Sequence, residues 1–389
     1  MPSASSNDPL LDVHSRSANL DVLRALAALY VLAGHAYLLS GSAIGFHDRH
    51  PVRLAINTGG SGVWLFFALS GYLIAKPFLA SLLSGDELPP TAPYTRRRAL
   101  RIFPAYWVAL AAIIAFGLAP GTSVSTEQLA VHAALLHNLV PGEQQAIFFG
   151  SWTLTLEVLF YASVPAIAWL VRRIWPGGVT LRALTAGVLG LWVGSAAFVA
   201  IAPSLVTGER GLWLRILFPS MVSMFCPGLL VALAVLSSRS GDTPRWFEVI
   251  AQNRRGSLLA AAVLAGAGAL GATLVPIRLY DASRQLFALA SAIVLVLAVT
   301  RAPLRVGGRL LGWLGLISYG IYLWQGVVIY VIERHPRFIP LHHTGGVAYV
   351  VHVTFLLALT VPLAWLSWRF VERPAIERRN TTPVAAASG

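Results

Sequence analysis

Three ionisable side chains, Arg24, His35 and Glu157, lie inside long apolar runs of this 389-residue sequence. A charged group inside an apolar span costs at least about 2.5–3.5 kcal/mol on insertion scales, so each of the three is a candidate for function. An imidazole can act as a general base at neutral pH, and a carboxylate can orient the ring and stabilise its protonated form. His35 and Glu157 therefore form a candidate catalytic pair, with a purely structural ion pair as the alternative.

Arg24 and His35 belong to the same apolar run, at residues 20–40. Eleven residues of helix turn through about 1100°, so the two side chains face the same way, about 16 Å apart along the axis. Glu157 lies about 10 Å from the outer end of its own run, and we expect His35 at a similar depth. The simpler readings are a snorkelling anchor for Arg24 and a helix–helix hydrogen bond for His35.

Four arginines, Arg96, Arg97, Arg98 and Arg101, occur within six residues just before the third apolar run. Arg98 and Arg101 are one helical turn apart, and each guanidinium can hold phosphate oxygens. The alternative is a topology signal that binds anionic lipid. Pro104 fits the first turn of the helix that follows.

The composition indicates a membrane protein, since 56% of the residues are hydrophobic, only 12% are charged and the mean hydropathy is +0.69. These values exclude a soluble globular enzyme and a disordered chain. The single cysteine, Cys226, excludes an intramolecular disulfide. We predict an all-α polytopic membrane protein of about ten transmembrane helices, because the apolar runs are continuous and long enough to cross a bilayer. The runs are 20–40, 59–81, 104–119, 150–171, 183–203, 212–236, 257–276, 285–300, 310–332 and 346–368.

The basic residues predict the orientation. With the N-terminus in the cytoplasm, 21 of the 29 Lys and Arg residues fall on the inner side and eight on the outer side. The loop at 120–149 holds no Lys or Arg, which marks it as outside. We therefore expect both termini in the cytoplasm and a multi-pass protein of the cytoplasmic (inner) membrane, with polar tails at 1–19 and 375–389 around one domain at 20–374. The net charge of +13 then orients the chain in the membrane and contacts its lipids, and we expect no nucleic-acid partner.

At these positions the sequence resembles the acyltransferase-3 family of membrane acyltransferases. The resemblance rests on six blocks in order from residue 20 to 374. They are Arg24 with His35; Gly62-Val63-Trp64-Leu65-Phe66-Phe67-Ala68-Leu69-Ser70-Gly71-Tyr72; Arg98 with Arg101; Trp152-Thr153-Leu154 with Glu157, Phe160 and Tyr161; Ile317-Ser318-Tyr319-Gly320-Ile321-Tyr322-Leu323-Trp324; and Glu372-Arg373-Pro374.

The resemblance implies transfer of an acyl group from a cytoplasmic acyl-CoA, acetyl-CoA or succinyl-CoA above all, to a hydroxyl group, without a metal. It implies that Arg24, Arg98 and Arg101 bind the CoA phosphates, that His35 is the general base and that Glu157 orients it. The candidates for substrate binding or for stabilising the oxyanion are Ser70, Tyr72, Trp152, Tyr319 and Gln325. The acceptor we expect is a cell-envelope glycan or glycolipid, and a secondary metabolite such as a macrolide is the alternative.

Two departures from the family pattern stand out. Many members carry histidine where this chain has Gln325, and glutamine cannot act as a base. Some relatives carry a C-terminal hydrolase-like domain, so we expect this chain to be the stand-alone form, with any such partner a separate protein. A transporter or flippase would also place Arg, His and Glu inside its spans, but the two halves of the sequence show no internal repeat. A non-catalytic membrane scaffold explains neither the shared face of Arg24 and His35 nor the depth of Glu157.

Overall fold

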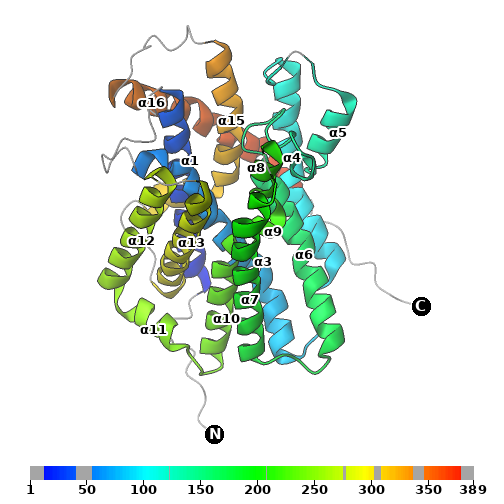
Figure 1. The fold of residues 1–389 in the computed structure, drawn as a ribbon, viewed down its shortest axis with the longest axis vertical. Coiled ribbons are helices and arrows are strands. Elements are labelled where there is room, and N and C mark those ends of the chain that lie inside the picture. The colour runs from blue at the N-terminus through cyan, green and yellow to red at the C-terminus, as the bar shows by residue number, and fades with distance from the viewer. Residues whose placement is uncertain are drawn as a thin grey trace, which may run out of the picture.

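The computed structural model describes residues 13–40, 55–121, 123–206, 208–274, 277–301, 308–335 and 346–377, and this part of the chain forms a bundle of helices (Figure 1). Eight helices are long and apolar enough to cross a membrane, and two bent helix pairs bring the number of candidate spans to ten. The eight are α1 (Val13–Leu39), α3 (Gly62–Ser84), α4 (Thr91–Ala115), α6 (Trp152–Ile174), α7 (Leu181–Ile201), α12 (Arg254–Leu274), α13 (Ile277–Thr300) and α16 (Gly346–Ser367).

Each bent pair contains a break inside the span. The first pair joins α9 (Phe218–Met221) and the 3-10 turn η4 (Val222–Met224) to α10 (Cys226–Arg239) at 42°. The second joins α14 (Gly308–Leu316) to α15 (Ser318–Arg334) at 66°. Short elements complete the described chain: η1 (Gly59–Ser61), α5 (Thr126–Ala133), η2 (His137–Leu139), η3 (Ala202–Ser204), α8 (Glu209–Leu214), α11 (Arg245–Gln252), the π-helical turn η6 (Trp368–Glu372) and α17 (Arg373–Glu377).

The predicted fold class is confirmed, while several predicted boundaries move. Helix α1 begins at Val13 rather than at residue 20, and the outermost parts of the predicted tails lie outside the described residues. Helix α4 begins at Thr91, so the prediction that Pro104 opens this helix is wrong. A proline inside a helix removes one backbone hydrogen bond, and the helix here continues through it. As a result Arg98 and Arg101 belong to α4 itself.

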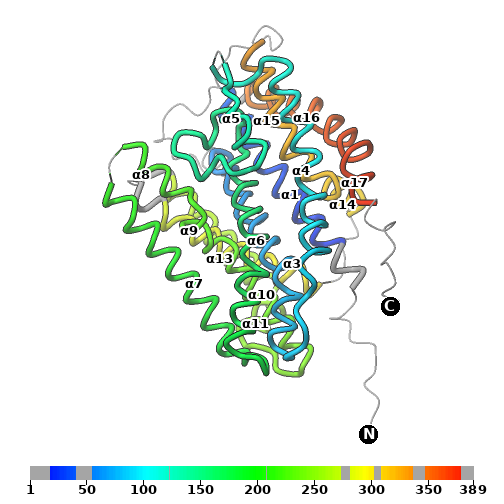
Figure 2. Tube along the Cα trace, turned by 90° about the vertical axis from the view of Figure 1, so that its right-hand side faces the viewer, coloured from blue at the N-terminus to red at the C-terminus, as the bar shows by residue number. Residues whose placement is uncertain are grey.

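Helices α1 and α3 form the centre of the bundle. Helix α3 packs against α1, α6, α10 and α13, and α1 also packs against α14, α15 and α16. In contrast, α7 lies along the outside of the molecule, as the turned view shows (Figure 2), and its contacts are with α9, α10, α13, η3 and η4. Groups carried by α1 and α3 are therefore held from several sides.

Glycines let α3 and α10 approach very closely. A Cβ added at Gly228 on α10 would lie 1.9 Å from the carbonyl oxygen of Ala68, and one added at Gly71 would lie 2.3 Å from the carbonyl oxygen of Phe225. Such distances are shorter than any real contact, so no side chain fits there. Because Gly71 follows Ser70 in sequence, this backbone contact also fixes the position of Ser70.

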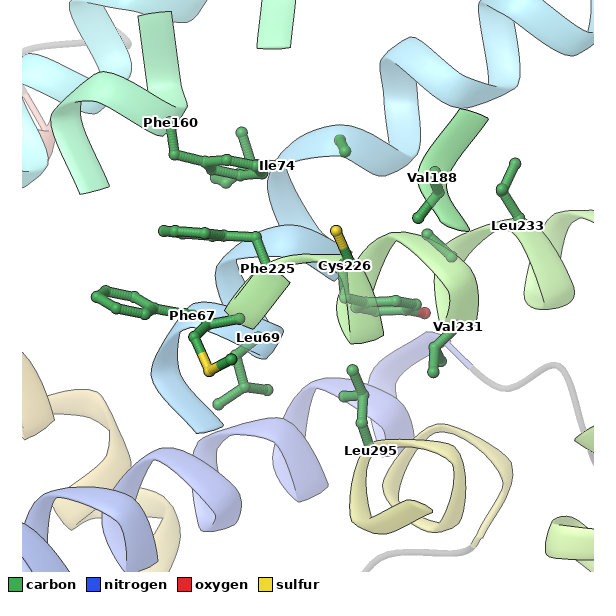
Figure 3. Packing of buried hydrophobic residues seen from close by; sticks show 14 of the residues in the cluster. Phe67, Leu69, Ile74, Phe160, Val188, Phe225, Cys226, Val231, Leu233 and Leu295 are labelled. Carbon is green, nitrogen blue, oxygen red and sulfur yellow. The ribbon is translucent and has the colours of Figure 1, made fainter. Parts of the chain in front are cut away.

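Aromatic rings fill the space beside this contact. The ring of Phe225 stacks on Phe160 at 4.1 Å and on Phe67 at 4.6 Å between centroids, and so joins α6, α10 and α3 (Figure 3). All three rings are buried. Stacked aromatic pairs contribute about 0.5–1.5 kcal/mol beyond their buried area.

The substitution Gly228→Ala should lower the free energy of unfolding by about 1–3 kcal/mol, because the added methyl group forces α3 and α10 apart. The measurement is the thermal unfolding of the purified protein in detergent. The matched control is Gly187→Ala on α7, where an added Cβ meets no atom within 4 Å. Equal losses of stability in the two variants would contradict the close contact.

Candidate active site

A cavity of about 120 Å3 lies between five helices, and it gathers most of the predicted site residues. Helices α1, α3, α4, α6 and α15 all contribute side chains to its wall. The residues of the cavity that carry polar or charged groups are Arg24, Ser70, Arg98, Arg101, Thr153, Glu157, Tyr161, Ser318, Tyr319 and Tyr322. The structure therefore brings together the three arginines and the glutamate that the sequence singles out.

Each of the three arginines is held differently. Arg24 forms an ion pair with Asp21 on its own helix, at 2.7 Å. Arg101 lies 3.5 Å from Glu372 of η6, a carboxylate that is almost fully buried. These contacts place two charge-balanced guanidinium groups in the wall of the cavity.

Arg98 is held by aromatic rings. Its guanidinium lies 5.8 Å from the ring centre of Tyr94 and 5.6 Å from that of Tyr161. Its Nε atom is buried without a hydrogen-bond partner. A buried N–H group without a partner is costly, so this donor is suited to an anionic ligand.

Glu157 accepts two hydrogen bonds inside the same cavity. The Ser70 hydroxyl donates at 2.9 Å and the Tyr161 hydroxyl donates at 2.5 Å, both to Oε1. Sequence reasoning did not include Tyr161 among the site residues. The signal was present, because Tyr161 lies four residues after Glu157 and therefore on the same face of α6.

One face of α15 leads out of the cavity. Ser318 and Tyr322 line the cavity, and Gln325 follows on the next turn of the same face. Tyr319 also lines the cavity, and its hydroxyl donates to the carbonyl oxygen of Ile102 on α4 at 2.7 Å. Ser318, Tyr322 and Gln325 are spaced by four and three residues, so their side chains lie one above the other on the same face of the helix.

Tyr322 on α15 and Phe66 on α3 both line the cavity and contact each other. The Tyr322 hydroxyl lies 2.7 Å from Oγ1 of Thr153 and donates to the carbonyl oxygen of Gly150 at 3.0 Å. The two aromatic rings meet edge to face, with centroids 6.1 Å apart. Neither residue was among the predicted site residues.

His35 does not line the cavity and lies beside Gln325. The Gln325 side chain is in hydrogen-bonding position to the imidazole, and the ring of Phe149 meets the imidazole edge to face at 4.9 Å. Two polar atoms at this contact, Nδ1 of His35 and Oε1 of Gln325, are buried without a hydrogen-bond partner. The Nδ1 position of His35 and Oε1 of Gln325 are therefore open to an incoming polar group.

A direct hydrogen bond between His35 and Glu157, which the sequence analysis expects, is not formed. Glu157 is bonded to Ser70 and Tyr161 in the cavity with the arginines, and His35 is placed beside Gln325 instead. The segment before α6 contributes to this arrangement, since Phe148 is buried there and Phe149, partly buried, meets the imidazole.

Tyr72 and Trp152 belong to the packing of the bundle rather than to the cavity wall. Tyr72 is buried in the main hydrophobic cluster, and its hydroxyl accepts a hydrogen bond from Lys76 at 3.2 Å. Trp152 packs against the same cluster at the start of α6. In the part of the chain that the structure describes, no three His, Cys, Asp or Glu side chains come together in a way that could hold a metal ion.

A pair of stacked histidines supports the segment that leads into α6. The rings of His132 on α5 and His137 on η2 are parallel within 2°, with centroids 4.2 Å apart, and both are fully buried. Nε2 of His137 lies 3.0 Å from the Ser151 hydroxyl, and Nε2 of His132 lies 3.5 Å from Glu143. Burial, together with the charge of His132, lowers the pKa of His137 to about 3. Burial also lowers the pKa of His132, against the opposing effect of Glu143.

Comparison with known proteins identifies the family of this chain. The sequence model of the family described as "Acyltransferase domain" matches residues 17–369. The chain belongs to the acyltransferase-3 family. It is therefore a membrane O-acyltransferase, and the resemblance carried by the six sequence blocks is confirmed.

Two of the matches to known relatives span most of this chain and most of the relative. It is 26% identical over 349 residues to the exopolysaccharide production protein ExoZ of Rhizobium meliloti, which covers 88% of this chain and 97% of that protein. It is 24% identical to nodulation protein 10 of Rhizobium leguminosarum bv. viciae, over 93% of this chain and 94% of that protein. A shorter match, 36% identical over 23% of each chain, is to the O-acetyl transferase of Shigella phage Sf6. No solved structure matches this member of the family.

The stability of this acyltransferase should fall as the pH falls below about 6.5, because protons then bind to His137 in the unfolded chain but not in the folded one. The folded-state pKa of about 3 lies below the ordinary value of 6.5, so the loss grows between these two values and is absent above pH 6.5. The measurement is the melting temperature between pH 7.5 and pH 4.5. The variant His137→Gln should show a shallower decline than the wild type, and identical slopes would contradict the role of this histidine.

Proposed function

We propose that this acyltransferase transfers a short acyl group from cytoplasmic acyl-CoA to a hydroxyl group of a cell-envelope glycan or glycolipid. The observation that carries the proposal is a cavity in which Arg24, Arg98 and Arg101 meet, together with His35 beside Gln325, one turn further along the face of α15 that lines this cavity. The cavity suits a polyanionic donor. His35 is a base with free hydrogen-bonding capacity.

The donor end is suited to the phosphates of CoA. Guanidinium groups form paired, charge-assisted hydrogen bonds with phosphate oxygens, and Arg98 has an Nε–H group that lacks a partner. Arg24 and His35 are about 16 Å apart along α1, which is comparable to an extended pantetheine arm. The small volume of the cavity, about 120 Å3, favours a short acyl group, such as acetyl or succinyl.

The transfer step follows from the groups around His35. The acceptor hydroxyl oxygen attacks the thioester carbonyl carbon while Nδ1 or Nε2 of His35 takes the hydroxyl proton. The tetrahedral intermediate collapses, the carbon–sulfur bond breaks and the CoA thiolate leaves. The imidazolium then returns its proton to the thiolate, so that the products are an ester and CoA. Gln325 would hold the imidazole in place during both proton transfers.

In this proposal Glu157 acts from the donor cavity. It fixes the Ser70 and Tyr161 hydroxyls and adds a negative charge that balances the arginines before the donor arrives. The Ser70 hydroxyl lines the cavity and would donate to the oxyanion after releasing Oε1 of Glu157. Glu157 would thus support His35 through the donor, rather than by direct contact with the ring.

The acceptor class rests on the relatives and on the expected topology. One relative is named for exopolysaccharide production and another is an O-acetyl transferase, and both names fit a glycan hydroxyl. With both termini in the cytoplasm, the arginines lie towards the cytoplasm and His35 lies towards the outside. A protein of the inner membrane could then pass an acyl group across the membrane to an acceptor outside.

The substitution His35→Ala should reduce acyl transfer by at least about 100-fold, because the general base is lost. The measurement is release of free CoA, followed by mass spectrometry, from a panel of acyl-CoAs of increasing chain length. The melting temperature of the variant serves as its folding control. Undiminished CoA release by a folded His35→Ala protein would exclude this histidine as the base.

The substitution Arg98→Gln should raise the KM for acyl-CoA about tenfold or more and change kcat much less, since a charged hydrogen bond contributes about 1.5–3 kcal/mol to binding. The matched control is Arg96→Gln, which removes the same charge from an exposed position on the same helix. If the two variants have equal KM values, the arginine cluster is a topology signal and not a donor site.

A further inference from the structure

A second concave surface lies on the outside of the bundle next to α7, and its lining is mostly apolar. It is an apolar groove of about 790 Å3 between α7, α10, α11 and α13, with one residue from α12. Its walls are aliphatic and aromatic apart from Thr185 and Arg182. In Figures 1 and 2 these helices form the side of the molecule away from α15 and α16.

The groove has the length of one leaflet of a bilayer. Its α7 wall runs from Leu181 to Trp192, a rise of eleven residues or about 16 Å of helix. The hydrocarbon core of a bilayer is about 30 Å thick, so one leaflet accounts for about half of that. At the Trp192 end the indole N–H donates to Gln285 at 2.7 Å, so this end presents no free donor among the groups described.

Positive charge gathers at the other end. Arg182 lines the groove there, and Arg245 lies between Pro244 and Trp246, which also line it. Both arginines are exposed. Helices α7 and α11 both begin at this end, and the N-terminus of a helix carries a partial positive charge. The nearest acidic side chain on α11, Glu248, does not line the groove.

Helix α11 has the pattern of a helix that lies at the membrane surface. Trp246 and Ile250, one turn apart, face the groove, while Phe247 is buried against the bundle. Trp246 remains 42% exposed, which is typical of an aromatic ring at the level of the lipid headgroups. A helix at the membrane surface would set the charged end of the groove at the depth of a phosphate group.

We propose that this groove binds one anionic phospholipid, with its acyl chains along α7 and its phosphate at Arg182 and Arg245. A second apolar groove of about 720 Å3 lies between α3, α6, α7 and α10, but none of the described residues in its wall is charged. An anionic lipid should therefore prefer the groove at Arg182. The site is separate from the cavity of the proposed reaction, and no residue lines both.

Native mass spectrometry of the full chain in detergent tests this site, with phosphatidylglycerol and phosphatidylcholine of identical acyl chains as probes. Phosphatidylglycerol should bind at least about fivefold more tightly, and the double variant Arg182→Gln with Arg245→Gln should remove that preference. The matched control is Arg173→Gln, an exposed arginine in the last turn of α6 that does not line the groove. Ala186→Phe, which fills the groove, should weaken the binding of both lipids.

Several results would overturn the site. They are equal binding of the two lipids, a preference that survives the double variant, and unchanged lipid binding by Ala186→Phe. A dimer that Ala186→Phe abolishes would assign the groove to a second copy of the chain. Displacement of phosphatidylglycerol by an equal amount of a polyprenyl phosphate would assign it to a lipid carrier instead.

Discussion

Positive charge inside an apolar bundle is the constraint on which the arrangement of this protein depends. Each guanidinium in the cavity is partly buried, so each is stabilised by a nearby group that compensates its charge. Arg24 finds Asp21 on its own helix, and Arg101 finds Glu372 from the far end of the chain. Arg98 lies against the ring of Tyr161, whose hydroxyl is bonded to Glu157. The contacts of Arg98 and Arg101 tie α4, α6 and η6 together around one space, while Arg24 is balanced within α1.

Several residues of the cavity could be predicted from the sequence, because charged residues are rare in this chain. Arg24, Arg98 and Arg101 stand out against an apolar background, and helical spacing alone places the last two on one face. The ten candidate spans follow from the same contrast. The resemblance to the family added Ser70 and Tyr319, both of which line the cavity.

The contacts between helices could not be read in this way. The partner of Arg101 is 271 positions away in the sequence, and helical periodicity says nothing about which helices meet. The placement of His35 beside Gln325 rather than Glu157 depends on the segment before α6, where His132 and His137 stack and Phe149 reaches the imidazole. The breaks before α10 and α15 leave the apolar runs uninterrupted, so hydropathy passes over them. Tyr322 and Phe66 line the cavity through packing, which residue type alone does not reveal.

The break between α14 and α15 has an electrostatic consequence. A helix that crossed the membrane without interruption would have its two ends, and thus the ends of its dipole, at the membrane surfaces. Helix α15 instead begins at Ser318, in the wall of the cavity, so the positive end of its dipole lies beside the three arginines. This part of the attraction for an anion belongs to the peptide backbone. It is present at every pH, and replacing side chains leaves it in place so long as the bend of 66° is kept.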